Sequence, residues 1–71
     1  MKTELVVKTN LKEIRTEKKM SQQELADLVG VSRNTISSLE TGQYEPSTKL
    51  ALVLATALDV KIDDLFYLDK K

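Results

Sequence analysis

Two short helical patterns separated by a glycine occupy residues 22 to 41. Leu25 and Val29 are four positions apart, so they lie on one face of a first helix. Gly30 can adopt the left-handed backbone conformation that ends a helix, which residues with a Cβ resist. Ser32 then offers a hydroxyl to cap a following helix. The stretch therefore predicts two helices joined by one tight turn.

The second of these helices has an apolar face and a polar face of unusual composition. Ile36 and Leu39 form the apolar face. The opposite face carries short hydrogen-bonding side chains and one arginine: Arg33, Asn34, Ser37, Ser38 and Thr41. A helix face that meets only solvent is usually filled with Lys and Glu. This face is better suited to a flat polar surface, such as the base edges in a groove of DNA.

Two capping-box patterns predict where earlier helices begin. Asn10 with Glu13 is expected to start a first helix, and Ser21 with Glu24 a second. A third serine, Ser47, is expected to cap a fourth helix with the sequence TKLALVLATAL. That helix is apolar nearly all round, which predicts a position at the centre of the domain.

The two end segments of the chain predict a minor β component. Residues 4 to 8 (ELVVK) are short and β-branched, and residues 66 to 69 (FYLD) could be extended. Each is too short to stand alone, so an antiparallel pairing between them is expected. Residues 62 to 66 add about one further helical turn before the second segment.

Size and composition limit the class of protein. A chain of 71 residues fits one domain, and without cysteine it has no disulfide, so helix packing or self-association must stabilise it. The absence of cysteine also fits a reducing cytoplasm. No apolar run is long enough to span a bilayer, and residues 5 to 7 are too short a run for a signal peptide.

The charge balance and the missing residue types bear on function. Basic and acidic residues number 11 each, which counts against nucleic-acid binding driven by a global field. Any DNA affinity must come from local donors and helix N-termini. With no His and no Cys, neither a Ser-His pair nor a metal cluster of the usual ligands can form. No enzyme activity, cofactor or metal is therefore expected.

The segment LKEIRTEKKMSQQELADLVGVSRNTISSLETGQYEPS resembles the helix-turn-helix domains of the lambda-like and 434-like phage repressor and Cro superfamily, also called xenobiotic-response-element-type regulators. The shared features are Arg15, Ser21-Gln22, Leu25-Ala26, Gly30-Val31-Ser32, Ile36, Leu39-Glu40, Gly42, Pro46-Ser47 and the apolar fourth helix. The resemblance runs from residue 10 to 66 and implies one all-α domain, a compact five-helix bundle. With a terminal ribbon, the chain is similar to the small dimeric repressors typified by the cytolysin repressor.

The resemblance also implies roles for individual residues. The third helix would be the recognition helix, with four residues facing bases: Arg33, Asn34, Ser37 and Ser38. Phosphate contacts would fall to residues of the second helix, the third helix and the loop after it: Gln22, Thr35, Gln43 and Tyr44, next to Gly42. The interior ion pair of the superfamily would join Arg15 and Glu40.

The chemistry of these side chains agrees with the implied roles, although each has a plainer alternative. Arg matches guanine O6 and N7, and Asn matches adenine N6 and N7. Arg33 places a positive charge at the N-terminal end of the helix, where the helix dipole disfavours it. Helix stability alone therefore does not explain an arginine at this position. The two serines are short, so base readout is expected to depend mainly on Arg33 and Asn34. Any of them could instead be an ordinary solvated residue, and Tyr44 could pack on Pro46.

The sequence therefore predicts a sequence-specific transcriptional regulator, a repressor, that binds a near-palindromic operator as a homodimer. The surplus of apolar residues near the C-terminus predicts the dimer contacts: Val60, Ile62, Leu65 and Leu68. Part of this set could instead belong to the core, Leu65 in particular. The alternative is an antitoxin-type module that neutralises a partner protein, for which only residues 1 to 9 and 67 to 71 are spare. No sizeable ligand pocket is expected, so control would come through concentration, a partner protein or promoter competition.

Overall fold

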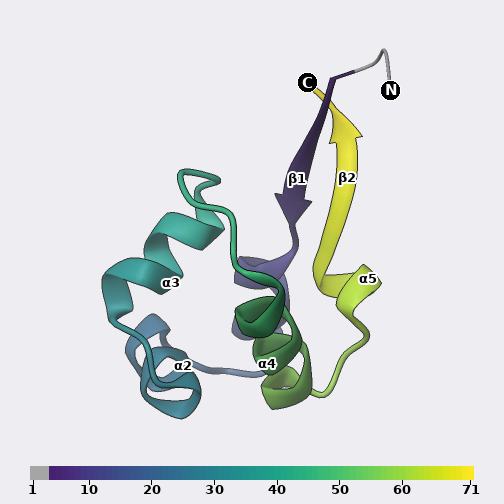
Figure 1. Cartoon of the computed structure of the whole chain (residues 1–71). Coiled ribbons are helices and arrows are strands. Elements are labelled where there is room, and N and C mark those ends of the chain that lie inside the picture. Colours follow the sequence, from purple (N-terminus) through teal and green to yellow (C-terminus); the bar gives the residue numbers. More distant parts are fainter. Residues whose placement is uncertain (1–3) are drawn as a thin grey trace.

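The computed structural model describes residues 4 to 71, with two strands at the ends of the chain and five helices between them. The elements follow in the order β1 (Leu5–Thr9), α1 (Leu11–Glu17), α2 (Gln22–Val29), α3 (Arg33–Glu40), α4 (Thr48–Leu58), α5 (Ile62–Leu65) and β2 (Phe66–Lys70) (Figure 1). The five predicted helices are confirmed, but "all-α" is too narrow a class because the strands form a sheet. Over these residues, no helix is long and apolar enough to cross a membrane.

The predicted pairing of the two end segments is confirmed. β1 and β2 form an antiparallel ribbon in which Val7 lies opposite Leu68 and Leu5 opposite Lys70. The ribbon projects away from the helices (Figure 1). Residues directly opposite each other share a face of a two-stranded sheet, and alternate residues along a strand share it too. Leu5, Val7 and Leu68 therefore lie on one face of the ribbon, and Leu68 is 63% exposed.

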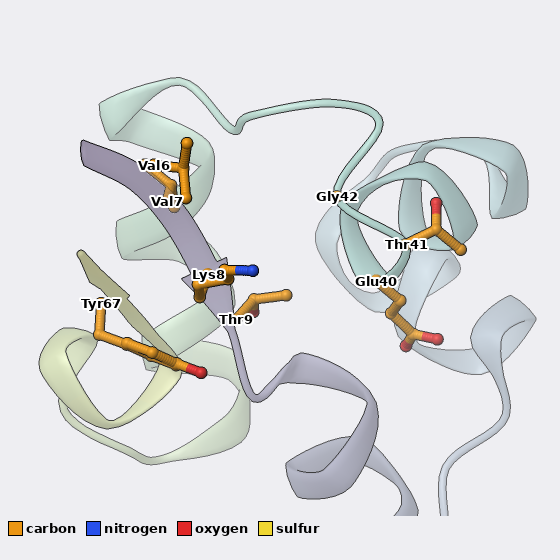
Figure 2. Close-up of a pocket in the computed structure, with 8 residues that line it drawn as sticks. All are labelled: Val6, Val7, Lys8, Thr9, Glu40, Thr41, Gly42 and Tyr67. Atoms are coloured by element: carbon orange, nitrogen blue, oxygen red, sulfur yellow. The ribbon is translucent and has the colours of Figure 1, made fainter. Parts of the chain in front are cut away.

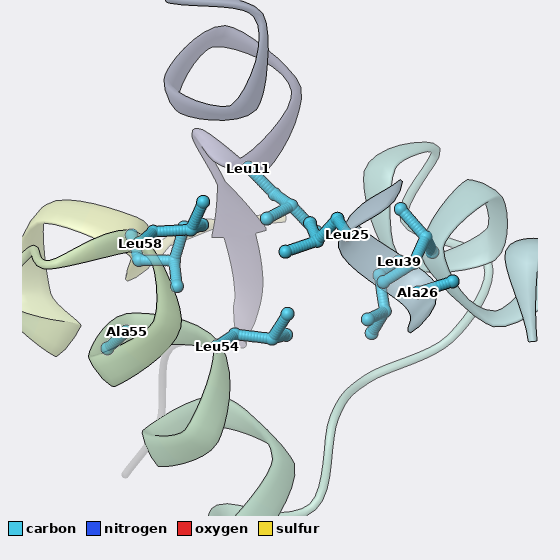
Figure 3. Packing of buried hydrophobic residues seen from close by; sticks show 9 residues of the cluster. Leu11, Leu25, Ala26, Leu39, Leu54, Ala55 and Leu58 are labelled. Carbon is cyan, nitrogen blue, oxygen red and sulfur yellow. The ribbon is translucent and has the colours of Figure 1, made fainter. Parts of the chain in front are cut away.

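One apolar cluster holds the helices together, and every helix contributes to it (Figure 3). Its buried members are Leu11, Leu25, Ala26, Ile36, Leu39, Leu54, Ala55, Leu58 and Leu65. The small Ala26 is fully buried in the pair formed by α2 and α3. Burial of apolar surface contributes about 25 cal/mol of stabilisation per Å². This cluster is therefore the main source of stability for a chain without cross-links.

The predicted position of α4 at the centre of the domain is confirmed for its inner face but not for its outer face. Leu54 and Leu58 point into the core at 0% and 1% exposure, whereas Leu52 is 51% exposed. Leu28 of α2 is 58% exposed and lines a shallow hollow of about 320 Å³ together with Leu52. A domain of this size has too few elements to cover a central helix on every side, so one apolar face remains open.

Three serine caps begin helices as the sequence predicted. The Ser21 hydroxyl accepts a hydrogen bond from the Glu24 amide at 3.0 Å, and the Glu24 carboxylate accepts one from the Ser21 amide at 2.9 Å. Ser32 caps α3, and Ser47 caps α4. Each bond satisfies an amide that the first turn of a helix leaves without a partner.

The predicted cap at Asn10 is wrong. Its side chain makes no capping bond and instead donates from Nδ2 to the Asp64 carbonyl at 3.0 Å. The Thr9 hydroxyl accepts from the Leu11 amide at 3.0 Å and donates to the Leu65 carbonyl at 2.9 Å. The start of α1 is therefore tied to α5, and these long-range bonds replace the local box.

Residues in the left-handed backbone conformation follow α1, α2, α3 and α4, and two of these residues are not glycine. Gly30 ends α2 with φ +80°, as predicted. After α1 the same conformation falls on Lys19 at φ 59°, and after α4 on Asp59 at φ 56°. At Lys19 the amides of two successive residues return to Thr16 and Arg15 carbonyls, closing a Schellman motif. Lysine is an uncommon residue in this conformation, so the sequence contained no sign of it.

The capping box makes the start of α2 sensitive to acid. The Ser21 backbone amide, and then its hydroxyl, hold the pKa of Glu24 below its ordinary value of 4.5. Because the pKa of Glu24 is lower in the folded state, the ionised carboxylate stabilises the fold. This stabilisation is complete above pH 4.5 and is lost as the pH falls through the lowered pKa. We expect the Ser21 amide resonance to titrate with a midpoint below 4.5 in NMR spectra. Glu24→Gln, which keeps a carbonyl acceptor, should remove the titration; a midpoint at or above 4.5 would contradict it.

Candidate nucleic-acid interface

Helix α3 exposes the polar face that the sequence pattern predicted. Ile36 and Leu39 are 0% and 2% exposed, so they fix the rotation of the helix against the core. The four predicted base-facing residues lie on its accessible side, two exposed and two half-buried: Arg33, Asn34, Ser37 and Ser38. The helix thus presents short polar groups and one guanidinium on its accessible side.

Four of the predicted contact residues surround one shallow hollow of about 270 Å³ beside α3: Asn34, Thr35, Ser38 and Tyr44. Two of them were predicted to contact bases and two to contact phosphates. The Thr35 hydroxyl lies 3.0 Å from the Ser32 hydroxyl at the start of the helix. Tyr44, 47% exposed, reaches this hollow from the loop after α3. The fold therefore gathers groups that are up to ten positions apart in the chain.

The loop after α3 begins with a second Schellman motif. Gly42 has φ +79°, and its amide donates to the Leu39 carbonyl at 3.2 Å. The Gln43 amide donates to the Ser38 carbonyl at 3.0 Å. Because both amides close the helix, neither is free for a ligand. Gln43 can offer only its exposed side chain to a phosphate.

Behind α3, a buried ion pair joins it to α1. The Arg15 Nε donates to Glu40 Oε2 at 2.6 Å, and its Nη2 donates to Oε1 at 3.3 Å. The side chains are 11% and 3% exposed, respectively. The remaining Nη1 donates to the Met20 carbonyl at 2.6 Å. One guanidinium therefore binds both the end of α3 and the turn before α2.

Gln22 connects this ion pair to Arg33 on the exposed side of α3. Its side chain is half-buried, and its Nε2 donates to Glu40 Oε1 at 3.0 Å. Its Oε1 accepts from Arg33 Nη1 at 3.4 Å. The sequence singled out these residues one by one but did not predict the connection. No local pattern could have done so, because Gln22 and Glu40 are 18 positions apart.

A further hollow of about 320 Å³ separates the ribbon from the end of α3 (Figure 2). It is lined by Val6, Val7, Lys8, Thr9, Glu40, Thr41, Gly42 and Tyr67. Its volume lies only at the lower limit of the volumes of ligand pockets. Half of its lining residues are themselves exposed, which makes it an open groove. The Lys8 amino group points towards the α3 side in Figure 2.

The predicted dimer contacts lie in very different environments. Leu65 is 0% exposed and belongs to the core, so its prediction as a dimer contact is wrong. It was misread because α5 turns it inward, against the helices. Val60 and Ile62 are half-buried and pack against the core, while Leu68 is exposed on the ribbon. In the part of the chain that the structure describes, no group of acidic side chains is arranged to hold a metal ion.

Comparison with known proteins adds independent evidence. Residues 11 to 65 match the family model described as Helix-turn-helix, from the start of α1 to the end of α5. An HTH-type transcriptional regulator of Archaeoglobus fulgidus is 46% identical over 65 residues, covering 92% of both chains. The structure of the restriction-modification controller protein C.AhdI from Aeromonas hydrophila is similar, with TM-score 0.72 and 42% identity over 76% of this chain and 82% of that one. The P22 c2 repressor, in complex with a synthetic operator, gives TM-score 0.72 and 34% identity over 75% of this chain and 80% of its own.

The buried ion pair predicts a non-additive mutational pattern. Glu40→Leu alone should destabilise the fold by about 3–5 kcal/mol, because it leaves the Arg15 guanidinium buried without a counter-charge. The double variant Arg15→Met/Glu40→Leu should lose much less, because it removes both charges and fills the space. Urea unfolding followed by circular dichroism measures each loss. Equal losses in the single and the double variant would contradict the expected coupling.

Proposed function

The chain belongs to this helix-turn-helix family of transcriptional regulators, and from that premise we propose that it is a repressor acting in the cytoplasm. It binds a near-palindromic operator as a homodimer and forms a single DNA-binding domain. The α3 helix of each copy enters the major groove. The main support is the polar, accessible face of α3, held in place by two fully packed residues in a fold shared with an operator-binding repressor.

Base recognition in this proposal depends on the first turn of α3. Arg33 and Asn34 are both exposed there, next to the turn that leads from α2. Arginine can donate two parallel hydrogen bonds to guanine, and asparagine can bond adenine in the same two-pronged manner. Ser37 and Ser38 follow one turn later and are too short to hold the helix away from the groove. Their small size allows the first turn to approach the bases.

Phosphate contacts would come mainly from neutral donors. The net charge is zero, so attraction by a global field is weak. Gln22 opens α2 and Thr35 lies in the first turn of α3, where helix N-termini favour anions. Gln43 and Tyr44 would add contacts from the loop after α3. Such contacts position the protein on the duplex but carry no base information.

Two copies are needed because one short helix reads too few base pairs to identify a site. The ribbon offers a surface for the second copy, since Leu5, Val7 and Leu68 lie on its one face and a two-stranded ribbon alone is marginally stable. Val60 and Ile62 lie near the start of the segment that leads into β2. A dimer seam over this face would bury Leu68 and place the two α3 helices on one side of the duplex.

Replacing Arg33 tests base recognition. Arg33→Ala should cost about 1–3 kcal/mol per half-site and relax preference at one base pair, since the two-pronged guanine contact is lost. Binding to the operator and to single-base variants of it gives both quantities. Lys61→Ala, which removes an equally exposed charge in the turn before α5, should leave the preference unchanged. If the parent chain bound random duplex as tightly as its operator at physiological salt, the proposal would fail.

A charge on the ribbon tests the dimer. Leu68→Glu should give a monomer in sedimentation and weaken operator binding, because the carboxylate would be buried in the seam. Leu52→Glu is the matched control: this leucine is also about half exposed but lies on α4. It should leave both the dimer and operator binding intact. A strictly monomeric parent that binds its operator tightly would refute the dimer.

A further inference from the structure

We propose that Glu40 is a positioning residue for base recognition, although its side chain is only 3% exposed. Through the side-chain amide of Gln22, it fixes where the Arg33 guanidinium rests before DNA binds. This inference rests on the proposed function, in which Arg33 reads a base. It assigns the interior ion pair a role in specificity in addition to its role in stability.

The first step is the direction of the Gln22 amide. An ionised carboxylate only accepts hydrogen bonds, so the group that faces Glu40 Oε1 must be the amide nitrogen. The observed contact is Nε2 to Oε1 at 3.0 Å. Rotating the amide by half a turn would place its oxygen against the carboxylate oxygen. Because the Glu40 side chain is only 3% exposed, little water is available to screen that repulsion.

The second step is the position of Arg33. With Nε2 held inward, Gln22 Oε1 faces outward and accepts from Arg33 Nη1 at 3.4 Å. A reversed amide would present a donor to a guanidinium, which has donors only. The Gln22 amide therefore directs its donor nitrogen to the Glu40 carboxylate and its acceptor oxygen to the Arg33 guanidinium, which is the electrostatically favourable orientation. The contact with Arg33 is long and exposed, so its effect is to restrict a mobile side chain.

The third step concerns what remains free for DNA. Arg33 uses one N–H of five, which leaves enough donors for two parallel bonds to guanine. Gln22 Nε2 has a second hydrogen that can still donate to a phosphate. A side chain that is already restricted loses less conformational freedom on binding. Gln22 would thus contribute both to overall affinity and to the base preference of Arg33.

The alignment depends on the ion pair as a whole. Arg15 holds the Glu40 carboxylate through two hydrogen bonds, so the carboxylate cannot turn away from Gln22. Arg15 also holds the Met20 carbonyl, immediately before the cap of α2. The position of the amide is therefore set from both ends, by the partner carboxylate and by the backbone that carries it.

Gln22→Met provides the direct test, since it keeps the length of the side chain, removes both amide contacts and leaves the ion pair intact. A residue that contacts only phosphate would weaken binding to all sequences equally. We expect instead that the discrimination ratio at the base pair read by Arg33 falls about threefold, the size of one modest hydrogen bond. In an Arg33→Ala background, the same change should leave that ratio unaltered.

The double variant Arg15→Met/Glu40→Leu tests the role of Glu40. It should lower the same discrimination ratio while other base positions keep theirs, and adding Gln22→Met should then cause no further loss of the ratio. A DNA-free readout accompanies it: in NMR spectra of the parent, the Gln22 side-chain amide should show one proton shifted downfield and protected from exchange. Both signatures should disappear in the double variant.

The outcomes separate this inference from the proposed function. A parent chain that discriminates among bases, with Gln22→Met weakening all sequences evenly, would overturn the inference and leave the proposed function standing. An unprotected Gln22 amide in the parent would overturn it as well, whatever the stability of the double variant. A parent chain that shows no base preference would refute both the proposed function and this inference.

Discussion

The buried pair of Arg15 and Glu40 is the interaction on which the arrangement of the helices depends. It joins α1 to the end of α3, and its third hydrogen bond reaches the turn before α2. Apolar contacts hold these helices together but allow them to slide or rotate slightly against each other. A two-pronged ion pair whose side chains are only 11% and 3% exposed restricts the relative geometry of the helices more strongly. A pair of this kind need not add net stability, yet it defines which packing is correct.

This constraint leaves the outer face of α3 available for the proposed base recognition. A helix of eight residues is unstable alone, so it must be held by its inner face and its ends. Ile36 and Leu39 anchor the inner face, Ser32 caps the start, and the motif at Gly42 closes the end. Nothing further is required of the outward side chains for folding. They can therefore be short polar groups with one arginine, which suits a groove better than solvent.

Several large apolar side chains remain exposed after folding. Leu68 on the ribbon and Leu52 on α4 lie exposed on different elements. A small domain cannot cover all of its apolar residues with its own chain, and self-association is a common solution. Of the two surfaces, only the ribbon is itself marginal without a partner, because two strands alone do not form a stable sheet. That difference favours the ribbon over α4 as the surface for the proposed dimer.

Contacts between near neighbours were readable from the sequence alone. The boxes and caps at Ser21, Ser32 and Ser47 and the turn at Gly30 were all predicted, because each involves groups at most a few positions apart. The same local reasoning failed at Asn10, whose side chain found a partner in α5 instead. It also had no means to identify Lys19, since the conformation there follows from how the chain must leave α1.

Two long-range contacts were expected from the sequence, the pairing of the end segments and the ion pair of Arg15 and Glu40, but the others were decided only by the tertiary structure. The residue types of the candidate site followed from the pattern on α3, and their roles in DNA binding remain predictions. The connection of Arg33 through Gln22 to Glu40 appeared only when three helices packed together. Likewise, Leu65 and Leu68 look alike in the sequence, but one is core and the other is exposed. The sequence determined which groups were available, and packing determined which of them meet, because burial and hydrogen bonding depend on neighbours far away in the chain.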